Sequence, residues 1–243
     1  MAKEGMSTVP DMKKDYTCIL FDLDHTLWDY ELNSRETLFE LYHQYDLVSK
    51  GVPGFDRFHN QFRIVNTELW ELYDTGQIGS QVIRMERFRK ILQAFYLFED
   101  DLSQQLSHDY LHTCPTKGNL MPHAIEVLEY LNKKYKLAVV TNGFEEIQNI
   151  KLSSSKLTSY FGHIITSQKA GHRKPSKEIF EYALKMNGAE CHQAIMIGDN
   201  LLTDMGGARN SSIDSVFFNP DSVKHDSTVS YEINSLAELR QIL

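Results

Sequence analysis

Two patterns of apolar residues divide the chain. Residues 16–24 (YTCILFDLD) form a short apolar run, as expected for a buried strand. From about residue 31 to residue 112 there is almost no strand signal, and apolar residues recur at the spacing of amphipathic helices. One such series is Phe58, Phe62, Val65, Leu69 and Leu72. Loop-forming segments at 49–55 and 74–80 interrupt this stretch, which therefore predicts three or four helices.

Beyond residue 115, β-branched apolar runs alternate with helical segments. The expected strands are 137–143, 163–167, 194–199 and 215–219, with a further short one at 230–233. The expected helices run from Pro122 to about Lys134, near 176–187 and near 203–209. Such alternation is typical of a parallel, doubly wound α/β sheet. We therefore predict an α/β fold with a Rossmann-like core and an α-helical insertion after the first strand.

The same patterns set the expected boundaries. Residues 1–15 form a flexible N-terminal tail, residues 16–30 and 115–243 form the core, and residues 31–114 form the helical insertion. The N-terminus is polar and lacks the apolar centre of a signal peptide, and no run reaches the length of a membrane span. We expect a soluble, cytoplasmic protein.

Composition and charge indicate which kinds of binding partner the protein is expected to have. The chain has 243 residues, of which 42% are hydrophobic and 24% charged, as in ordinary globular proteins. Its formal net charge is -8 and it has no basic block, which argues against binding a nucleic acid polymer through its phosphates. Three scattered cysteines form neither a zinc-binding pair nor a disulfide framework. The sequence leaves the oligomeric state open, a monomer included.

Polar residues lie at the ends of four of the predicted strands or in the loops that follow them. In chain order they are Asp22 and Asp24; then Thr141, Asn142 and Gly143; then Lys174; then Asp199 and Asp204. Because ligands bind beyond the carboxyl ends of parallel strands, we expect these side chains to converge. Each motif alone has a structural explanation, since Asp-x-Asp and Gly-Asp-Asn can cap turns or helices and Thr-Asn-Gly can form a turn. Their consistent position after buried strands favours a functional site.

Such a set of side chains suits phosphoryl chemistry. Several carboxylates in one place repel one another and require a cation, and oxygen ligands without histidine or cysteine suit Mg²⁺. Mg²⁺ and a lysine would neutralise a phosphoryl group, while a threonine hydroxyl with asparagine and glycine N–H groups would hold its oxygens. One aspartate can act as the nucleophile, and the second, two residues on, as the general acid and base.

These residues resemble the haloacid dehalogenase (HAD) superfamily. Its four motifs are matched by DLDHT (residues 22–26), Thr141, Lys174 and GDNLLTD (residues 198–204), and the insertion lies where this superfamily has a helical, C1-type cap. The resemblance implies Asp22 as the nucleophile and Asp24 as the acid and base.

The resemblance also implies ligand roles. Thr141, with Asn142 and Gly143, would bind the phosphate, and Lys174 would bridge the phosphate and the nucleophile. Mg²⁺ would be bound by Asp22, Asp199 and the main-chain carbonyl of Asp24, with Asp204 in support.

Three neighbouring assignments are less favoured. The dehalogenase branch lacks an acid at the position of Asp24, so we do not expect halide displacement. Response-regulator receivers place their phosphoacceptor after a middle strand and carry no large insertion. Lys169 competes for the lysine role, but the sequence Arg-Lys-Pro around Lys174 matches the family pattern better.

Within the superfamily, residues 24–42, 66–88 and 141–161 resemble the bacterial 5′-nucleotidases that hydrolyse pyrimidine and non-canonical nucleoside monophosphates. The chain departs from the usual pattern at His25 and Gln168. Trp28, Tyr30, Arg63, Asn66 and Trp70 lie in regions where a side chain could contact such a substrate, with packing as the favoured alternative for most of them. We therefore expect an Mg²⁺-dependent phosphatase for a small phosphomonoester, most simply a nucleoside 5′-monophosphate, acting without a membrane.

The alternatives are a phosphatase for a sugar phosphate, phosphoglycolate or an acylneuraminate phosphate, a phosphomutase, and a non-catalytic binding protein on the same fold.

Overall fold

The computed structural model describes residues 15–243, so the predicted N-terminal tail lies almost wholly outside the described part. Its centre is a six-stranded sheet in which every neighbouring pair is parallel, in the order β3-β2-β1-β4-β5-β6. The strands are β1 (Cys18–Phe21), β2 (Lys136–Thr141), β3 (His163–Thr166), β4 (Ala194–Gly198), β5 (Asp214–Phe218) and β6 (Tyr231–Ile233). The expected parallel α/β core is confirmed.

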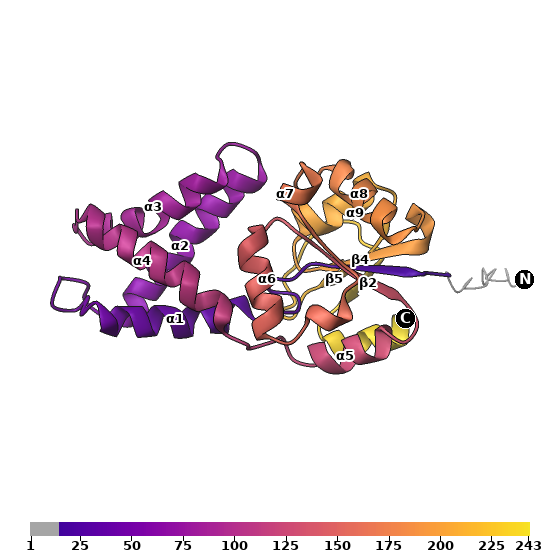
Figure 1. The fold of residues 1–243 in the computed structure, drawn as a ribbon, viewed down its shortest axis with the longest axis horizontal. Coiled ribbons are helices and arrows are strands. Elements are labelled where there is room, and N and C mark those ends of the chain that lie inside the picture. The colour runs from indigo at the N-terminus through magenta and orange to yellow at the C-terminus, as the bar shows by residue number, and fades with distance from the viewer. Residues whose placement is uncertain (1–14) are drawn as a thin grey trace, which may run out of the picture.

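Helices cover both faces of the sheet (Figure 1). On β1, Ile19 and Phe21 belong to the apolar cluster that includes the side chains of α5 (Ala124–Leu131) and α10 (Leu239–Ile242). Cys18 and Leu20 belong to the cluster on the opposite face, with α8 (Lys177–Asn187) and α9 (Gly206–Asn210). Both faces of the strand are buried because alternate side chains point to opposite sides, which explains the continuous apolar runs in the sequence.

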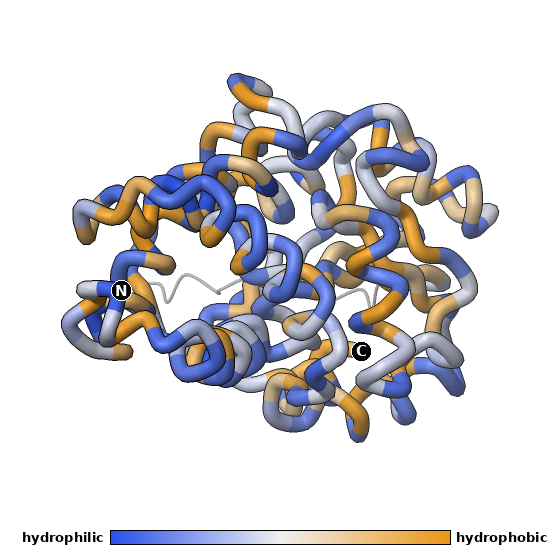
Figure 2. The backbone as a smooth tube through the Cα atoms, turned by 60° about the vertical axis from the view of Figure 1, so that its left-hand side comes forward, coloured by the Kyte–Doolittle hydropathy of each residue, from blue (hydrophilic) through white to orange (hydrophobic). Residues whose placement is uncertain are grey.

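Four helices between β1 and β2 form a separate layer, called here the helical unit. They are α1 (Tyr30–Gln44), α2 (Phe55–Asp74), α3 (Ser80–Gln93) and α4 (Asp100–Thr113). Figure 1 shows the unit beside the carboxyl-terminal edge of the sheet, and Figure 2 shows apolar and polar stretches alternating along its helices. Its centre is filled by the rings of Phe58, Phe62, Phe88 and Tyr110.

The chain enters and leaves the helical unit at one point. Asp29 caps α1 by accepting a hydrogen bond from the Leu32 N–H, and its own N–H donates to the carbonyl of Asn119, 3.1 Å away. The Asn33 and Asn119 side chains complete this clasp: Asn33 donates to the Asn119 carbonyl at 2.9 Å, and Asn119 donates to Asn33 Oδ1 at 2.8 Å. The two connections therefore lie side by side.

Two of the predicted helices have other bounds in the structure, and the helices at Glu145–Ser154, Ser167–Ala170 and Leu239–Ile242 were not predicted. The helix expected from Pro122 to about Lys134 is shorter, Ala124–Leu131, because His123 adopts a left-handed conformation (φ 68°) that cannot be part of a right-handed helix. The segment expected near 203–209 starts earlier, as a single π-helical turn at Leu201–Met205 that continues into α9. Within residues 15–243, no helix combines the length and the apolar character needed to span a bilayer.

Candidate active site

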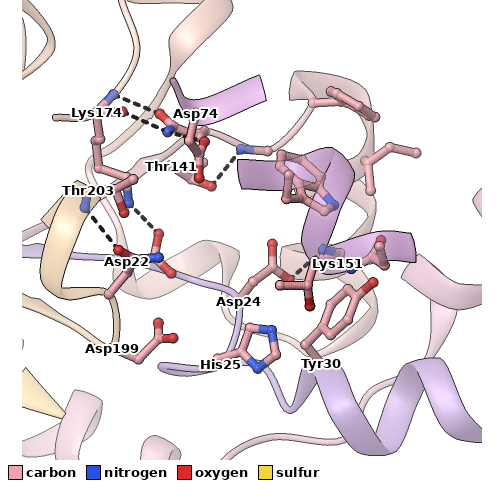
Figure 3. Close-up of a pocket in the computed structure, with 18 of the residues that line it drawn as sticks. Asp22, Asp24, His25, Tyr30, Asp74, Thr141, Lys151, Lys174, Asp199 and Thr203 are labelled. Carbon is pink, nitrogen blue, oxygen red and sulfur yellow. Dashed lines mark hydrogen bonds and ion pairs between the residues drawn. The ribbon is translucent and has the colours of Figure 1, made fainter. Parts of the chain in front are cut away.

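All eight residues that the sequence singled out line one cavity of about 350 Å³. The ends of β1, β2 and β4 and the loop after β3 supply them, and Figure 3 shows several of these side chains turned toward one another. Residues of the helical unit form the rest of the wall, so the cavity lies between the unit and the sheet. Its size is within the range of small-molecule sites.

Lys174 joins two of the carboxylates. Its ammonium nitrogen lies 2.5 Å from Asp22 Oδ1 and 2.6 Å from Asp204 Oδ1, and only 2% of the lysine is exposed. Burial alone would lower the pKa of Lys174, but Asp204 and Asp22 raise it above its usual range, so the lysine is charged. The rival Lys169 is exposed and pairs with Glu145. Lys174 is therefore the lysine of this site.

Asp22, Asp199 and Asp204 form an acidic cluster with carboxylate oxygens within 4.8 Å of one another. Burial is the main reason why the pKa of Asp22 is raised, and it raises the pKa of Asp199 to about 6. Three carboxylates against the single ammonium of Lys174 leave two excess negative charges. The donor set thus fits a divalent cation with hard oxygen ligands.

The hydrogen bonds show which oxygens are free for such a cation. Asp204 uses both: Oδ1 contacts Lys174 and Oδ2 accepts from the Asn200 N–H at 3.1 Å. Asp22 and Asp199 each have one oxygen engaged, by Lys174 and by the Thr26 hydroxyl respectively. Asp22 and Asp199 are therefore better placed to hold a metal, and Asp204 to support them. Gly198 is required here because a Cβ would collide with the Asp204 carboxylate.

Asp24 points away from this cluster and toward helix α6 (Glu145–Ser154) (Figure 3). Lys151 lies 2.5 Å from Asp24 Oδ1, and Gln148 donates to Oδ2 at 2.8 Å. Burial alone would raise the pKa of Asp24, but these two partners hold it below its ordinary value. Neither residue was predicted from the sequence. The three-residue spacing that places both side chains on one face of a helix indicates a shared role but does not indicate their partner.

The turn after β2 is held by its own side chains. The Thr141 hydroxyl accepts from the Gly143 N–H at 3.0 Å and from Gln148 at 2.8 Å. The Asn142 amide donates to Asp74 and to the Lys174 carbonyl, and its oxygen accepts from the Lys174 N–H. The Asn142 side chain is thus committed to fixing the Lys174 loop. Asn142 can therefore contact a phosphate only through its backbone.

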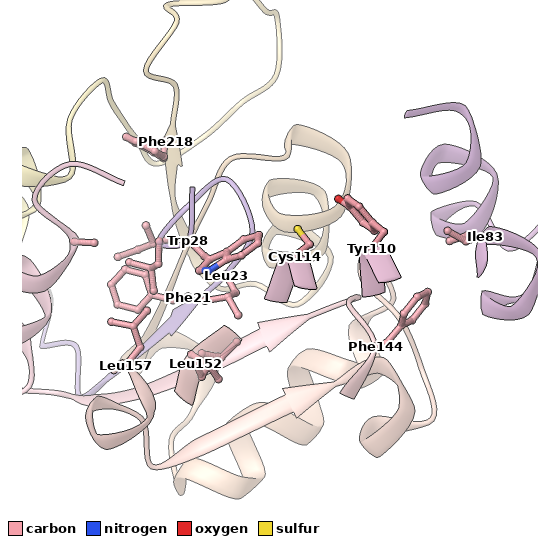
Figure 4. Close-up of a cluster of buried hydrophobic side chains, with 14 of the residues drawn as sticks. Phe21, Leu23, Trp28, Ile83, Tyr110, Cys114, Phe144, Leu152, Leu157 and Phe218 are labelled. Carbon is pink, nitrogen blue, oxygen red and sulfur yellow. The ribbon is translucent and has the colours of Figure 1, made fainter. Parts of the chain in front are cut away.

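The side chains expected near the substrate fall into two groups. Tyr30, Asn66 and Trp70 line the cavity, and Trp70 stacks on Phe144, which the sequence analysis did not select. Trp28 is fully buried beside Phe21 and Leu23 (Figure 4), and its indole N–H donates to the Lys117 carbonyl. Arg63 is exposed and pairs with Glu31. In the structure, neither Trp28 nor Arg63 is positioned to contact a substrate in the cavity.

The two departures from the family pattern have local explanations. His25 takes a left-handed conformation (φ 63°), lines the cavity and packs its ring against Tyr30, with 4.7 Å between centroids. Histidine is one of the few non-glycine residues enriched in this conformation. Gln168 accepts a hydrogen bond from the Glu145 N–H at the start of α6. Position 168 therefore helps to position the helix that carries Lys151.

Comparison with known proteins identifies the family. The family model for haloacid dehalogenase-like hydrolases matches residues 19–218. The chain belongs to this family. The resemblance inferred from the four motifs is confirmed, and the protein is a hydrolase of the haloacid dehalogenase-like type.

Individual relatives cover nearly the whole chain. The pyrimidine 5′-nucleotidase PynA of Streptococcus pneumoniae is 28% identical, over 94% of this chain and 95% of its own. The pyrimidine 5′-nucleotidase YjjG of Escherichia coli is 26% identical, over 96% and 99%. The magnesium-bound crystal structure of the HAD hydrolase YfnB of Bacillus subtilis, in which interdomain movement is described, superposes with a TM-score of 0.84 at 27% identity, covering 94% of this chain and 99% of YfnB.

Proposed function

We propose that this HAD-like hydrolase is an Mg²⁺-dependent phosphatase for nucleoside 5′-monophosphates, with a preference for pyrimidines. The observation that carries the proposal is the buried Asp22 carboxylate, fixed by Lys174 at one end of a cavity whose wall also holds Thr141 and Asp24. The nucleotidase activity of PynA and YjjG supports the choice of substrate.

In the proposed reaction, Asp22 attacks the phosphorus atom and the bond to the leaving oxygen breaks, forming an aspartyl-phosphate. Lys174 holds the Asp22 carboxylate in place for this attack. Asp24 acts in this step in its protonated form, the minority form given its lowered pKa. It gives that proton to the leaving oxygen and releases the alcohol. The Asp24 carboxylate then takes a proton from water, which attacks the phosphorus and releases phosphate and free Asp22.

The surrounding groups position and neutralise the phosphoryl group. Thr141 and the backbone N–H groups after β2 bind its oxygens, while Lys174 bridges it to Asp22. Mg²⁺, held by Asp22, Asp199 and the Asp24 carbonyl with Asp204 in support, would stabilise the negative charge. We further propose that the helical unit is the cap of this site. Its Asp74 accepts a hydrogen bond from the Asn142 amide at 2.8 Å, which joins cap and core.

The substrate proposal is tested by phosphate release from dUMP, dTMP, UMP, AMP, sugar phosphates and phosphoglycolate, with Mg²⁺ and with EDTA. We expect Mg²⁺-dependent turnover that is highest for the pyrimidine nucleotides. Phosphate release from sugar phosphates alone would support the phosphatase activity and contradict the nucleotidase assignment. No release from any ester would favour a mutase or a binding protein.

The metal site predicts a specific thermal shift. Mg²⁺ at a hundredfold excess over its Kd should stabilise the wild type by about 2.7 kcal/mol, or several degrees in Tm. Asp199→Asn should lose most of this shift because it removes a ligand charge, whereas Asp221→Asn, an exposed acid, should retain it. Calorimetry with and without Mg²⁺ measures both. An undiminished shift in Asp199→Asn would place the ion elsewhere.

The Lys151 contact predicts an effect on turnover. Lys151→Met should lower kcat by about 10- to 100-fold, because the Asp24 carboxylate loses the partner that holds it at the leaving oxygen. Lys185→Met, which removes an exposed lysine from α8, should have no effect. Steady-state kinetics on the preferred substrate compares the two. Equal kcat values for both variants would show that Gln148 suffices to place Asp24.

A further inference from the structure

Arg87 on helix α3 is a buried cation without a carboxylate partner within the described chain, residues 15–243. It lines the cavity with only 3% of its surface exposed. One guanidinium nitrogen, Nη1, donates to Asn66 Oδ1 at 3.1 Å. The other two, Nε and Nη2, are buried and have no hydrogen-bond partner. The two lysines of the same cavity, Lys151 and Lys174, are both paired with carboxylates.

Stability alone does not explain this arginine. Its guanidinium carbon lies 4.5 Å from the ring centroid of Tyr110, and Phe62 and Phe88 are within 6 Å. Cation–π contacts offset part of the cost of burying the charge, but they satisfy neither free N–H group. A hydrophobic side chain of similar length would fill this place at no loss of stability. An arginine kept here points to a ligand that supplies the missing acceptors.

The free nitrogens define the chemistry of that ligand. Nε and Nη2 lie on one edge of the planar guanidinium and present two parallel donors. Carboxylates and phosphates can accept such a pair with two oxygens, and one carbonyl oxygen of a nucleobase can accept both N–H groups with its two lone pairs. The adjoining wall favours a planar ring, since Trp70 and Phe144 are stacked with centroids 5.5 Å apart and both line the cavity.

We propose that Arg87, held by Asn66, binds the carbonyl edge of a pyrimidine base that lies against the aromatic wall of Trp70 and Phe144. The inference rests on the proposed nucleotidase function and names the cap residue that recognises the base. Both free nitrogens are covered by neighbouring side chains, so binding requires Arg87 to turn toward the cavity. The helical unit then recognises the base, and the residues at the carboxyl ends of the strands bind the phosphate.

The test compares two substrates that differ only in the base, dUMP and 2-deoxyribose 5-phosphate. Arg87→Met should lower kcat/KM for dUMP by about 10- to 100-fold, the scale of hydrogen bonds from a charged donor. It should change kcat/KM for deoxyribose 5-phosphate less than threefold, and Tm should stay equal or rise because a buried charge is removed. Arg89→Met, an exposed arginine two residues further along the same helix, should match the wild type on both substrates.

Arg87→Lys gives a second readout, since it keeps the charge and loses the paired donors; it should also lose the preference for dUMP. If Arg87→Met loses kcat/KM equally on both substrates, or on neither, the proposed role of Arg87 is wrong. Turnover of dUMP by the wild type would still support the nucleotidase function in that case. A wild type that ignores dUMP and hydrolyses a sugar bisphosphate or a carboxylate-bearing sugar phosphate would overturn the assignment of the base.

Discussion

Asp22→Asn should reduce kcat by at least about 10⁴-fold, the scale at which an enzyme loses its nucleophile. The amide has nearly the shape of the carboxylate, and its oxygen can still accept from Lys174, but it cannot form the aspartyl-phosphate. The fold should persist, because Lys174 keeps Asp204 as its ionic partner. Phosphate release measures the first effect, and thermal unfolding measures the second.

Two further measurements make this prediction specific. Asp221→Asn, an exposed change of the same kind, should retain wild-type turnover. Beryllofluoride or aluminium fluoride should form an adduct on Asp22 of the wild type, as a mimic of the phosphorylated residue. Substantial activity in Asp22→Asn, or an adduct on another side chain, would contradict the assignment of the nucleophile.

Lys174→Met should damage stability and activity together. Removing this lysine leaves Asp22 and Asp204 buried without a cation, and breaking a buried ion pair in this way costs about 3–5 kcal/mol. For a chain of this size we expect Tm to fall by roughly 10 °C. Turnover should fall by about 10²–10³-fold or more, because a charge that stabilises the phosphoryl group is lost.

Lys169→Met is the matched control, since Lys169 is exposed and its pair with Glu145 contributes little. The pH dependence provides a second check. Burial raises the pKa of Asp22, so an unpaired carboxylate there costs most stability above that raised pKa, and the cost declines as the pH falls toward the ordinary pKa of an aspartate. The stability deficit of Lys174→Met should therefore shrink as the pH is lowered. A deficit in Lys169→Met of the same size would reverse the assignment of the two lysines.

The strand ends were predictable from the sequence because parallel-sheet geometry leaves little choice. A buried apolar run followed by Asp22, or by Asp199, must present that residue at the carboxyl edge of the sheet. The convergence of all eight residues follows from that rule. The helical nature of the insertion, predicted as three or four helices, followed from its apolar periodicity for the same reason, since each helix buries one face.

The partners of these side chains were not predictable, because contacts between distant segments decide them. Asp24 and Lys151 are 127 positions apart in the sequence, and nothing near either residue signals the pair. The commitment of the Asn142 side chain to the Lys174 loop likewise depends on how two loops meet. Trp28 was mistaken for a substrate contact because an aromatic residue after the first motif looks the same in sequence whether it faces the cavity or the core.

The clasp between Asn33 and Asn119 has a consequence for how such enzymes diversify. Because the chain departs from the sheet and returns to it at one hydrogen-bonded point, residues 30–118 can be regarded as a module grafted into a loop. Exchanging that module does not require the strands to be rerouted. New specificities can then arise by replacing the insert as a whole, while Asp22, Asp24 and Lys174 stay in place at the end of the sheet.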